Sequence, residues 1–117
     1  MDYKPRQGDI VWIDFDPTRG HEIKKRRPAL VISSDDYNSA TNFIIVSPIT
    51  HTIRSIPGYF TLSGYATEGQ VVTQQVYSLD ATKNGKRNPV FIEKMNINEF
   101  LIVMQLVEFN FNFNMLK

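Results

Sequence analysis

Short apolar runs separated by proline, glycine and polar residues make up most of the chain. In the first run, DIVWIDF at residues 9–15, Ile10 and Trp12 fall on one face while Val11 and Ile13 fall on the other. Apolar residues on both faces predict a strand that is buried largely on both sides. The DPTRG that follows breaks the strand, because proline cannot donate to a ladder and glycine lets the backbone turn.

Five more short runs predict strands at close spacing. They cover residues 28–33, 42–49, 59–62, 70–75 and 90–94. Between the first two of these runs, the polar DDYNSATN predicts a turn or a single helical turn. This spacing favours a small barrel or sandwich over a parallel α/β fold. The sequence shows no repeats or linkers, which predicts one domain over the whole chain, 1–117.

The period of the pattern changes near the end of the chain. Asn96 followed by Glu99 is a capping signature, and the apolar residues after it recur at helical spacing. We expect a helix from Ile97 to Phe109, with an apolar stripe that covers the barrel or a partner subunit. The closing FNFNMLK alternates with period two and predicts an added strand or an ordered tail.

The amino-acid composition limits the classes of protein to which this chain can belong. The 117 residues have room for one domain, and 42% hydrophobic with 21% charged residues is ordinary for a globular protein. No apolar run approaches the roughly 20 residues that span a bilayer, and MDYKPRQGD lacks the apolar segment of a signal peptide. With no cysteine and two histidines, neither a disulfide nor a protein-only zinc site is expected. We expect a cytoplasmic protein without a metal or cofactor.

Positive charge is concentrated near the N-terminus, although the net charge is only +1. Seven of the thirteen lysines and arginines lie in the first 27 residues, four of them consecutive. Arg27 precedes Pro28, and the proline restricts the Arg27 backbone to extended conformations. The Arg27 guanidinium is therefore held at the start of a strand, and its planar fork of donors suits phosphate. Lys24, Lys25 and Arg26 lack such an anchor and are expected to be solvated cations that collect a polyanion.

Three further side chains carry candidate chemistry. Glu22 repels phosphate unless it orients an arginine or accepts a proton, and His21 has the side chain that titrates nearest neutral pH. Thr50 follows the apolar strand where the chain leaves the sheet, so its hydroxyl could donate to a phosphoryl oxygen. The alternatives, a solvated loop charge for the first two and a turn cap for the threonine, stay open on this pattern.

Residues 8–33, GDIVWIDFDPTRGHEIKKRRPALVIS, together with VSPIT at 46–50, resemble the MazF/PemK family of toxin endoribonucleases from type II toxin–antitoxin modules. The order of motifs carries the resemblance: a strand, a DPT-x-G-x-E loop, RP, an apolar strand and P-x-T. Residues 63–80 align more loosely, and the C-terminal helix aligns by pattern alone. The resemblance implies a mainly β fold, a small SH3-like barrel of the CcdB/MazF/PemK type with a C-terminal α-helix, assembled as a homodimer.

The resemblance also implies an activity and its partners. Family members cleave single-stranded RNA without a metal, many at a short recognition sequence, and are silenced by an antitoxin that occupies the RNA-binding surface. DNA would be contacted only through the toxin–antitoxin complex, and no membrane is involved. The family's catalytic arginine and threonine fall on Arg27 and Thr50, and its loop glutamate and histidine fall on Glu22 and His21.

One position departs from the family pattern. Several members have an aspartate where this chain has Gln74, and an amide cannot act as a general base, so proton transfer would fall on the loop, on Thr50 or on water. Tyr59 and Phe60 are further stacking candidates that fit a core equally well. The expected RNA-binding residues are Lys24, Lys25, Arg26, Arg54, Gln74, Gln75 and Tyr77.

Two alternative functions remain. One is a toxin of the gyrase-directed CcdB branch without nuclease activity, although this chain ends in Asn-Met-Leu-Lys and lacks the Trp-Gly-Ile ending of that branch. The other is a catalytically inactive homologue that regulates its own operon with an antitoxin, an alternative that Gln74 keeps open.

Overall fold

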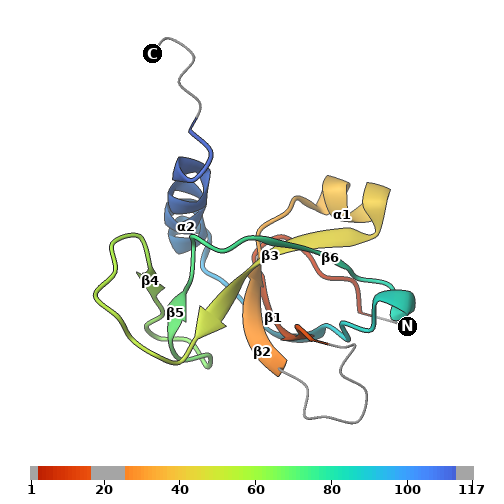
Figure 1. Cartoon of the computed structure of the whole chain (residues 1–117), viewed down its shortest axis with the longest axis horizontal. Coiled ribbons are helices and arrows are strands. Elements are labelled where there is room, and N and C mark those ends of the chain that lie inside the picture. Colours follow the sequence, from red (N-terminus) through yellow and green to blue (C-terminus); the bar gives the residue numbers. More distant parts are fainter. Residues whose placement is uncertain (1–2, 17–25, 113–117) are drawn as a thin grey trace.

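The computed structural model describes residues 3–16 and 26–112. Seven strands, two α-helices and one 3-10 turn follow one another along these residues (Figure 1). Their bounds are β1 (Asp9–Asp14), β2 (Arg26–Val31), α1 (Asp35–Thr41), β3 (Phe43–Thr50), β4 (Phe60–Thr61), β5 (Gln70–Val71), β6 (Tyr77–Asp80), η1 (Lys83–Gly85), β7 (Val90–Lys94) and α2 (Ile97–Phe109).

The strands form one curled antiparallel sheet with a branch. The larger part runs in the order β6, β3, β2, β1, β7, and its two end strands are not paired with each other within the described residues, so it is a half-barrel. Beyond Pro48, β3 is no longer paired with β2; its opposite edge, which pairs with β6 further back, pairs here with β5, and β5 in turn pairs with β4. We call the point where β3 leaves β2 the fork; Figure 1 shows the end of β3 turning toward β5 and away from β2.

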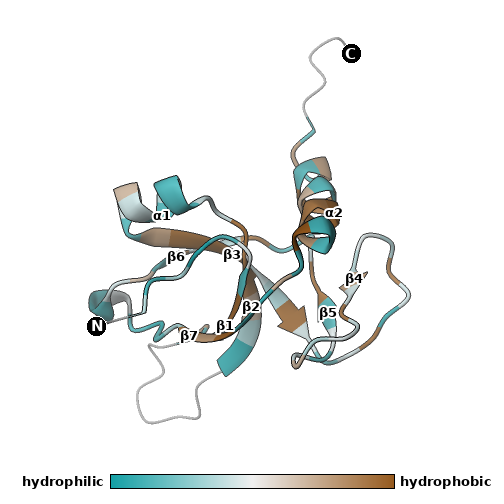
Figure 2. Cartoon of the chain, turned by 180° about the vertical axis from the view of Figure 1, so that it is seen from behind, coloured by the Kyte–Doolittle hydropathy of each residue, from teal (hydrophilic) through white to brown (hydrophobic). Residues whose placement is uncertain are grey.

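Two apolar clusters lie on opposite faces of the half-barrel, because successive strand residues point to opposite sides. The inner cluster fills the concave side and consists of Val11, Ile13, Ala29, Val31, Ile44, Val46 and Leu79. The outer cluster lies beneath α2 and includes Ile10, Leu30, Ile49, Val71, Phe100, Val103 and Val107. In Figure 2, hydrophobic stretches run along the strands of the half-barrel and along α2. The prediction that β1 is buried on both sides is confirmed, with Trp12 partly exposed.

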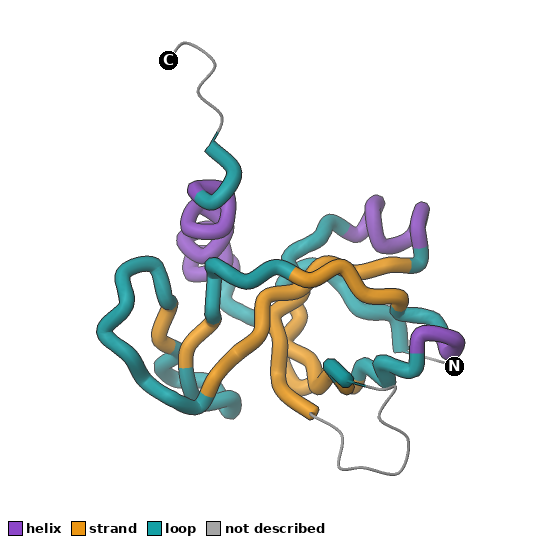
Figure 3. The backbone as a smooth tube through the Cα atoms, viewed as in Figure 1, coloured by secondary structure: helices purple, strands orange, loops and turns teal. Residues whose placement is uncertain are grey.

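The predicted C-terminal helix is confirmed from Ile97 to Phe109. It begins at Asn96, whose side chain accepts hydrogen bonds from the N–H groups of Asn98 and Glu99 at 2.9 and 3.2 Å. Such a cap satisfies backbone donors that have no partner inside the helix. In Figure 3, α2 stands beside the strands and its C-terminal end projects beyond them. None of the described helices is long and apolar enough to cross a membrane.

Three local predictions need correction. The strand expected over residues 70–75 ends at Val71. The Val72 N–H still donates in register to the Pro48 carbonyl at 2.8 Å, but proline has no N–H to return the bond, and the N–H groups of Thr73 and Gln75 then turn to the carbonyls of Val71 and Val72. The strand β6, at residues 77–80, was not predicted. The polar segment at residues 35–41 forms seven residues of helix, more than the single turn expected, and the helix starts at the Ser34 cap.

Candidate functional site

Arg27 and Thr50 lie at the fork, on the same face of the sheet. Ala29 pairs with Pro48, so two residues further along each strand stand Arg27 on β2 and Thr50 at the end of β3. Arg27 pairs with Ile13, which belongs to the inner cluster, so the shared face is the concave one. Arg27 is exposed and Thr50 is partly exposed. The register therefore brings the two predicted catalytic residues to one open mouth of the half-barrel.

The hydroxyl of Thr50 caps a turn and still has a hydrogen to donate. Its Oγ1 accepts a hydrogen bond from the N–H of Thr52 at 3.3 Å, the turn-capping role that the sequence left open. A hydroxyl can accept and donate together, because it has two lone pairs and one hydrogen. The cap thus orients the side chain without consuming its donor.

Gly69 holds the backbone of Thr50 in place. It has φ of +124°, a conformation that residues with a side chain rarely adopt. A Cβ at this position would lie 2.0 Å from the Thr50 carbonyl oxygen and 2.9 Å from its carbonyl carbon. Only glycine therefore lets β5 approach the end of β3 so closely.

We call the end of β3, β5 and β4 the small sheet. Residues 51–58, which we call the β3–β4 loop, are attached by two buried side chains, one in the small sheet and one just after it. The Gln70 side chain accepts from the Arg54 N–H at 3.0 Å and donates to the Arg54 carbonyl at 3.1 Å. The Thr73 hydroxyl donates to the carbonyl of Gly58. Gln70 and Thr73 are 4% and 1% exposed, so both attachments lie out of solvent. The exposed side chain of Arg54 is thus carried on a held backbone.

Arg26 is anchored, so the prediction that it lacks an anchor is wrong. Its Nη1 lies 2.8 Å from Oδ1 of Asp14, which faces it across the β1–β2 pair and whose side chain is 7% exposed. The other carboxylate oxygen of Asp14 accepts from Asn88 at 2.9 Å. Since successive strand residues alternate, Arg26 faces away from Arg27 and toward the outer side of the sheet.

One aromatic pair lies on the concave face. Tyr77 pairs with Val46 and is 42% exposed, and its ring meets that of Phe15 at 5.6 Å between centroids with an angle of 69°. The edge of one ring against the face of the other is a favoured aromatic geometry. Phe60, in contrast, packs against the outer cluster, which favours the core interpretation for that residue.

Several predicted residues remain to be placed. Gln74 and Gln75 are exposed in the segment after β5, and the Tyr77 hydroxyl donates to Gln75 at 3.5 Å. His51, exposed directly after Thr50, was not among the predicted site residues because the P-x-T motif ends at Thr50. His21, Glu22, Lys24 and Lys25 lie outside the described residues.

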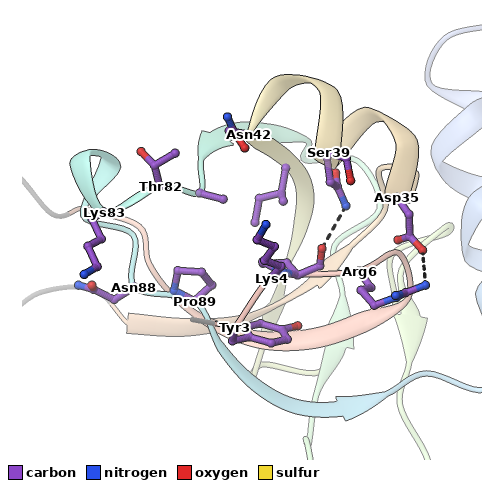
Figure 4. A pocket seen from close by; sticks show the side chains of 14 residues that line it. Tyr3, Lys4, Arg6, Asp35, Ser39, Asn42, Thr82, Lys83, Asn88 and Pro89 are labelled. Carbon is purple, nitrogen blue, oxygen red and sulfur yellow. Dashed lines mark hydrogen bonds and ion pairs between the residues drawn. The ribbon is translucent and has the colours of Figure 1, made fainter. Parts of the chain in front are cut away.

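A cavity lies away from the fork. It measures about 640 Å³ and lies between α1, the N-terminal segment and residues 81–89. Figure 4 shows Lys4 reaching into its middle and the ion pair of Arg6 with Asp35 at its side, at 2.8 Å. None of the predicted site residues lines it. Within the described ranges, no group of three His, Asp or Glu side chains could hold a metal ion.

The sequence profile of the PemK-like, MazF-like toxins of type II toxin–antitoxin systems matches residues 6–108. The chain belongs to this family. The endoribonuclease toxin MazF of Escherichia coli strain K12 is 38% identical over 92 residues, which cover 74% of this chain and 83% of that protein. The family match and this relative favour the nuclease branch over the gyrase-directed alternative.

Solved structures agree with the family assignment. A crystal structure of MazF from Deinococcus radiodurans has a TM-score of 0.75 and 30% identity, over 91% of this chain and 94% of that chain. A MazE–MazF structure from the same organism has a TM-score of 0.80 and 28% identity, over 97% of this chain and 100% of that chain. The expected mainly β fold with a C-terminal helix is thereby confirmed.

Proposed function

We propose that this chain is a cytoplasmic endoribonuclease, a single domain over residues 1–117 that cuts single-stranded RNA at a short recognition sequence and so inhibits translation and growth. The observation that carries the proposal is the position of Arg27 and Thr50 on the same face of the sheet, on the two strands that separate at the fork. A positioned guanidinium and a hydroxyl with a free hydrogen are the two donors that an anionic phosphorus centre requires. The relatives named endoribonucleases support the same activity.

The chemistry proposed is attack by the RNA 2′-hydroxyl on the neighbouring phosphorus. The bond between phosphorus and the 2′-oxygen forms while the bond to the 5′-oxygen breaks, leaving a 2′,3′-cyclic phosphate and a 5′-hydroxyl. The proton leaves the 2′-oxygen and another is delivered to the 5′-oxygen, so the reaction balances without a metal or cofactor. Two such transfers require a base and an acid near the phosphate.

Different residues stabilise the charge and transfer the protons in this reaction. Arg27 stabilises the extra negative charge with a bidentate fork and Thr50 donates beside it, each contributing about 3 kcal/mol by analogy with oxyanion-hole donors. His21 or Glu22 transfers the proton. Arginine is not assigned as acid or base, because a guanidinium with a pKa above about 12 holds its proton too firmly.

The RNA-binding surface extends from the fork along the concave face. Arg54, on the β3–β4 loop, contributes an exposed cation, and Tyr77 with its partner Phe15 offers a stacking platform for an unpaired base. Lys24 and Lys25 add charge that collects the polyanion. Gln74 and Gln75 supply neutral donors and acceptors to base edges.

A homodimer and an antitoxin complete the proposal. Helix α2 is apolar on faces that do not contact its own barrel, with Ile97, Leu101 and Phe109 each more than half exposed. Large apolar side chains exposed together on a helix are typical of a contact surface, so we assign this surface to a second copy of the chain. The MazE–MazF structure supports a cognate antitoxin as a partner, and we propose that it covers the fork.

The test is RNA cleavage in excess EDTA with mapping of the new ends. A long, mostly unstructured RNA is incubated with the protein, with Arg27→Ala and with Thr50→Ala. Discrete cuts with 5′-hydroxyl ends that vanish in both variants are expected. Intact RNA at high concentrations of folded protein would exclude the nuclease and leave the inactive, regulatory homologue. Arg27→Lys keeps the charge and loses the fork, so near-normal cleavage by this variant would rule out the bidentate role.

A further inference from the structure

The small sheet beside the fork has one apolar and one polar row. Ile49, Val71 and Phe60 lie opposite one another and face α2 in the outer cluster. The next row consists of Thr50, Gln70 and Thr61, which therefore share the other face. Gln70 is thus the cross-strand neighbour of the proposed catalytic threonine.

Gln70 is a buried amide with three hydrogen bonds. Besides its two bonds to the backbone of Arg54, its Nε2 donates to Oγ1 of Thr61 at 2.9 Å. A buried amide is stable only with its donors and acceptors satisfied, and here two of the three bonds depend on the β3–β4 loop. The position of that loop and the position of the amide therefore determine each other.

A short chain of contacts connects the amide to the reacting hydroxyl. Arg54 is held at both its N–H and its carbonyl, and two residues earlier the N–H of Thr52 donates to the Thr50 hydroxyl at 3.3 Å. A loop segment released at Arg54 would let Thr52 turn away, and Thr50 would lose the bond that orients its side chain.

We propose that Gln70 is a positioning residue for RNA cleavage: its amide fixes residues 52–54 of the β3–β4 loop and, through the Thr52 N–H, the hydroxyl of Thr50. This inference rests on the proposed function, because it assigns the effect to Thr50. Released loop residues can still meet RNA, whereas a rotated hydroxyl donates poorly to the transition state. The loss should therefore fall on kcat more than on KM.

The experiment compares Gln70→Leu with Thr61→Val on a short RNA with a single cleavage site. Leucine keeps most of the volume of glutamine and removes all three hydrogen bonds, while Thr61→Val removes only the bond that does not reach the loop. We expect kcat of Gln70→Leu to fall at least about tenfold with KM changed by less than about threefold. Thr61→Val should keep kcat within about twofold of the starting protein.

A second readout needs no RNA. In Gln70→Leu, hydrogen exchange at the Arg54 and Thr52 amides should accelerate by at least about tenfold, while core amides such as that of Val31 keep their protection. Should Gln70→Leu not fold, Arg54→Pro is compared with Arg54→Ala. Both variants lack the guanidinium, but only the proline lacks the N–H that donates a hydrogen bond to Gln70. Arg54→Pro should therefore have a lower kcat than Arg54→Ala.

The outcomes separate this inference from the proposed function. If Thr50→Ala and Arg27→Ala are inactive while Gln70→Leu retains full kcat, or if Thr61→Val loses as much as Gln70→Leu, the positioning role is refuted and the nuclease site stands. If Thr50→Ala cleaves RNA normally, the catalytic role of Thr50 and the positioning role of Gln70 are both refuted, while the nuclease activity stands. Loss of kcat together with faster exchange at Arg54 and Thr52, confined to Gln70→Leu, supports the inference.

Discussion

Replacing Gly69 by alanine is the sharpest structural perturbation of the fork. Alanine at φ of +124° is strained, which costs about 1–3 kcal/mol in such sparsely populated backbone regions. The added Cβ would also lie 2.0 Å from the Thr50 carbonyl oxygen, whereas real Cβ atoms essentially never approach closer than 3.0 Å. The end of β3 must therefore move by about 1 Å, and overpacking of this kind costs a further 1–3 kcal/mol or so.

Gly64→Ala is a matched control. Gly64 also has positive φ, +83°, but a Cβ there would meet no atom within 4 Å. Both variants carry backbone strain, and only Gly69→Ala adds the collision with Thr50. Urea unfolding should therefore show Gly69→Ala less stable than Gly64→Ala by about 1–3 kcal/mol.

Catalysis should separate the two variants more strongly. Misplacement of a reacting group by about 1 Å can lower a rate about 10²-fold, so Gly69→Ala should lose cleavage on that order while Gly64→Ala stays near the starting rate. The assay is single-turnover RNA cleavage at a temperature where both variants remain folded by circular dichroism. Equal stability and equal cleavage of the two variants would refute the claim that Gly69 holds Thr50.

Three further predictions test other parts of the fold. Asp14→Ala should lower the free energy of unfolding by about 2–3 kcal/mol in urea titrations, because a nearly buried carboxylate loses its bonds to Arg26 and Asn88; a loss below about 0.5 kcal/mol would contradict this. Partial burial raises the pKa of Glu93, but hydrogen bonds from Ala66 and Thr67 outweigh this effect and hold the pKa below the ordinary 4.5. The stability that the Glu93 carboxylate contributes is therefore full above pH 4.5 and lost as the pH falls through the lowered folded pKa. Glu93→Gln should flatten the acid limb of a stability–pH curve, and an unchanged limb would count against these bonds. Leu101→Lys, at an exposed apolar position of α2, should convert the proposed dimer to monomer in sedimentation experiments, whereas an unchanged mass would place the dimer face elsewhere.

The success of the sequence predictions depended on how local the signal was. Helix α2 was predicted to the residue, because the Asn96 cap and the helical period lie within one segment. Strand β6 was missed although Tyr77 and Leu79 alternate with Ser78 and Asp80, because four residues are the shortest stretch in which such alternation indicates a strand. The strand expected to reach residue 75 stops at Val71 because Pro48 on β3, distant in sequence, has no N–H to pair with Val72, and a turn follows.

The distinction between local and long-range signals also applies to the residues of the site. Arg27 and Thr50 were found through motifs, since each is marked by a neighbouring proline. Gln70 was not, because its role depends on a loop that begins nearly twenty residues earlier in the chain and returns to cover it. Arg26 was misjudged for a related reason: its partner Asp14 becomes visible only when the register of β1 against β2 is known.

Some residues around the fork have fixed positions and others have exposed side chains. This arrangement explains how a small domain could combine a rigid catalytic site with a variable surface for RNA bases. Arg27 and Thr50 lie on strands whose other residues are mostly buried, so the proposed phosphate contacts would have fixed positions. The β3–β4 loop is exposed along most of its length yet attached at Gln70 and Thr73, so its outward side chains can vary without moving its backbone. An enzyme that cuts RNA at chosen bases needs a constant geometry at the phosphate and a variable surface for the bases, and rigid strands carrying a doubly attached loop supply both.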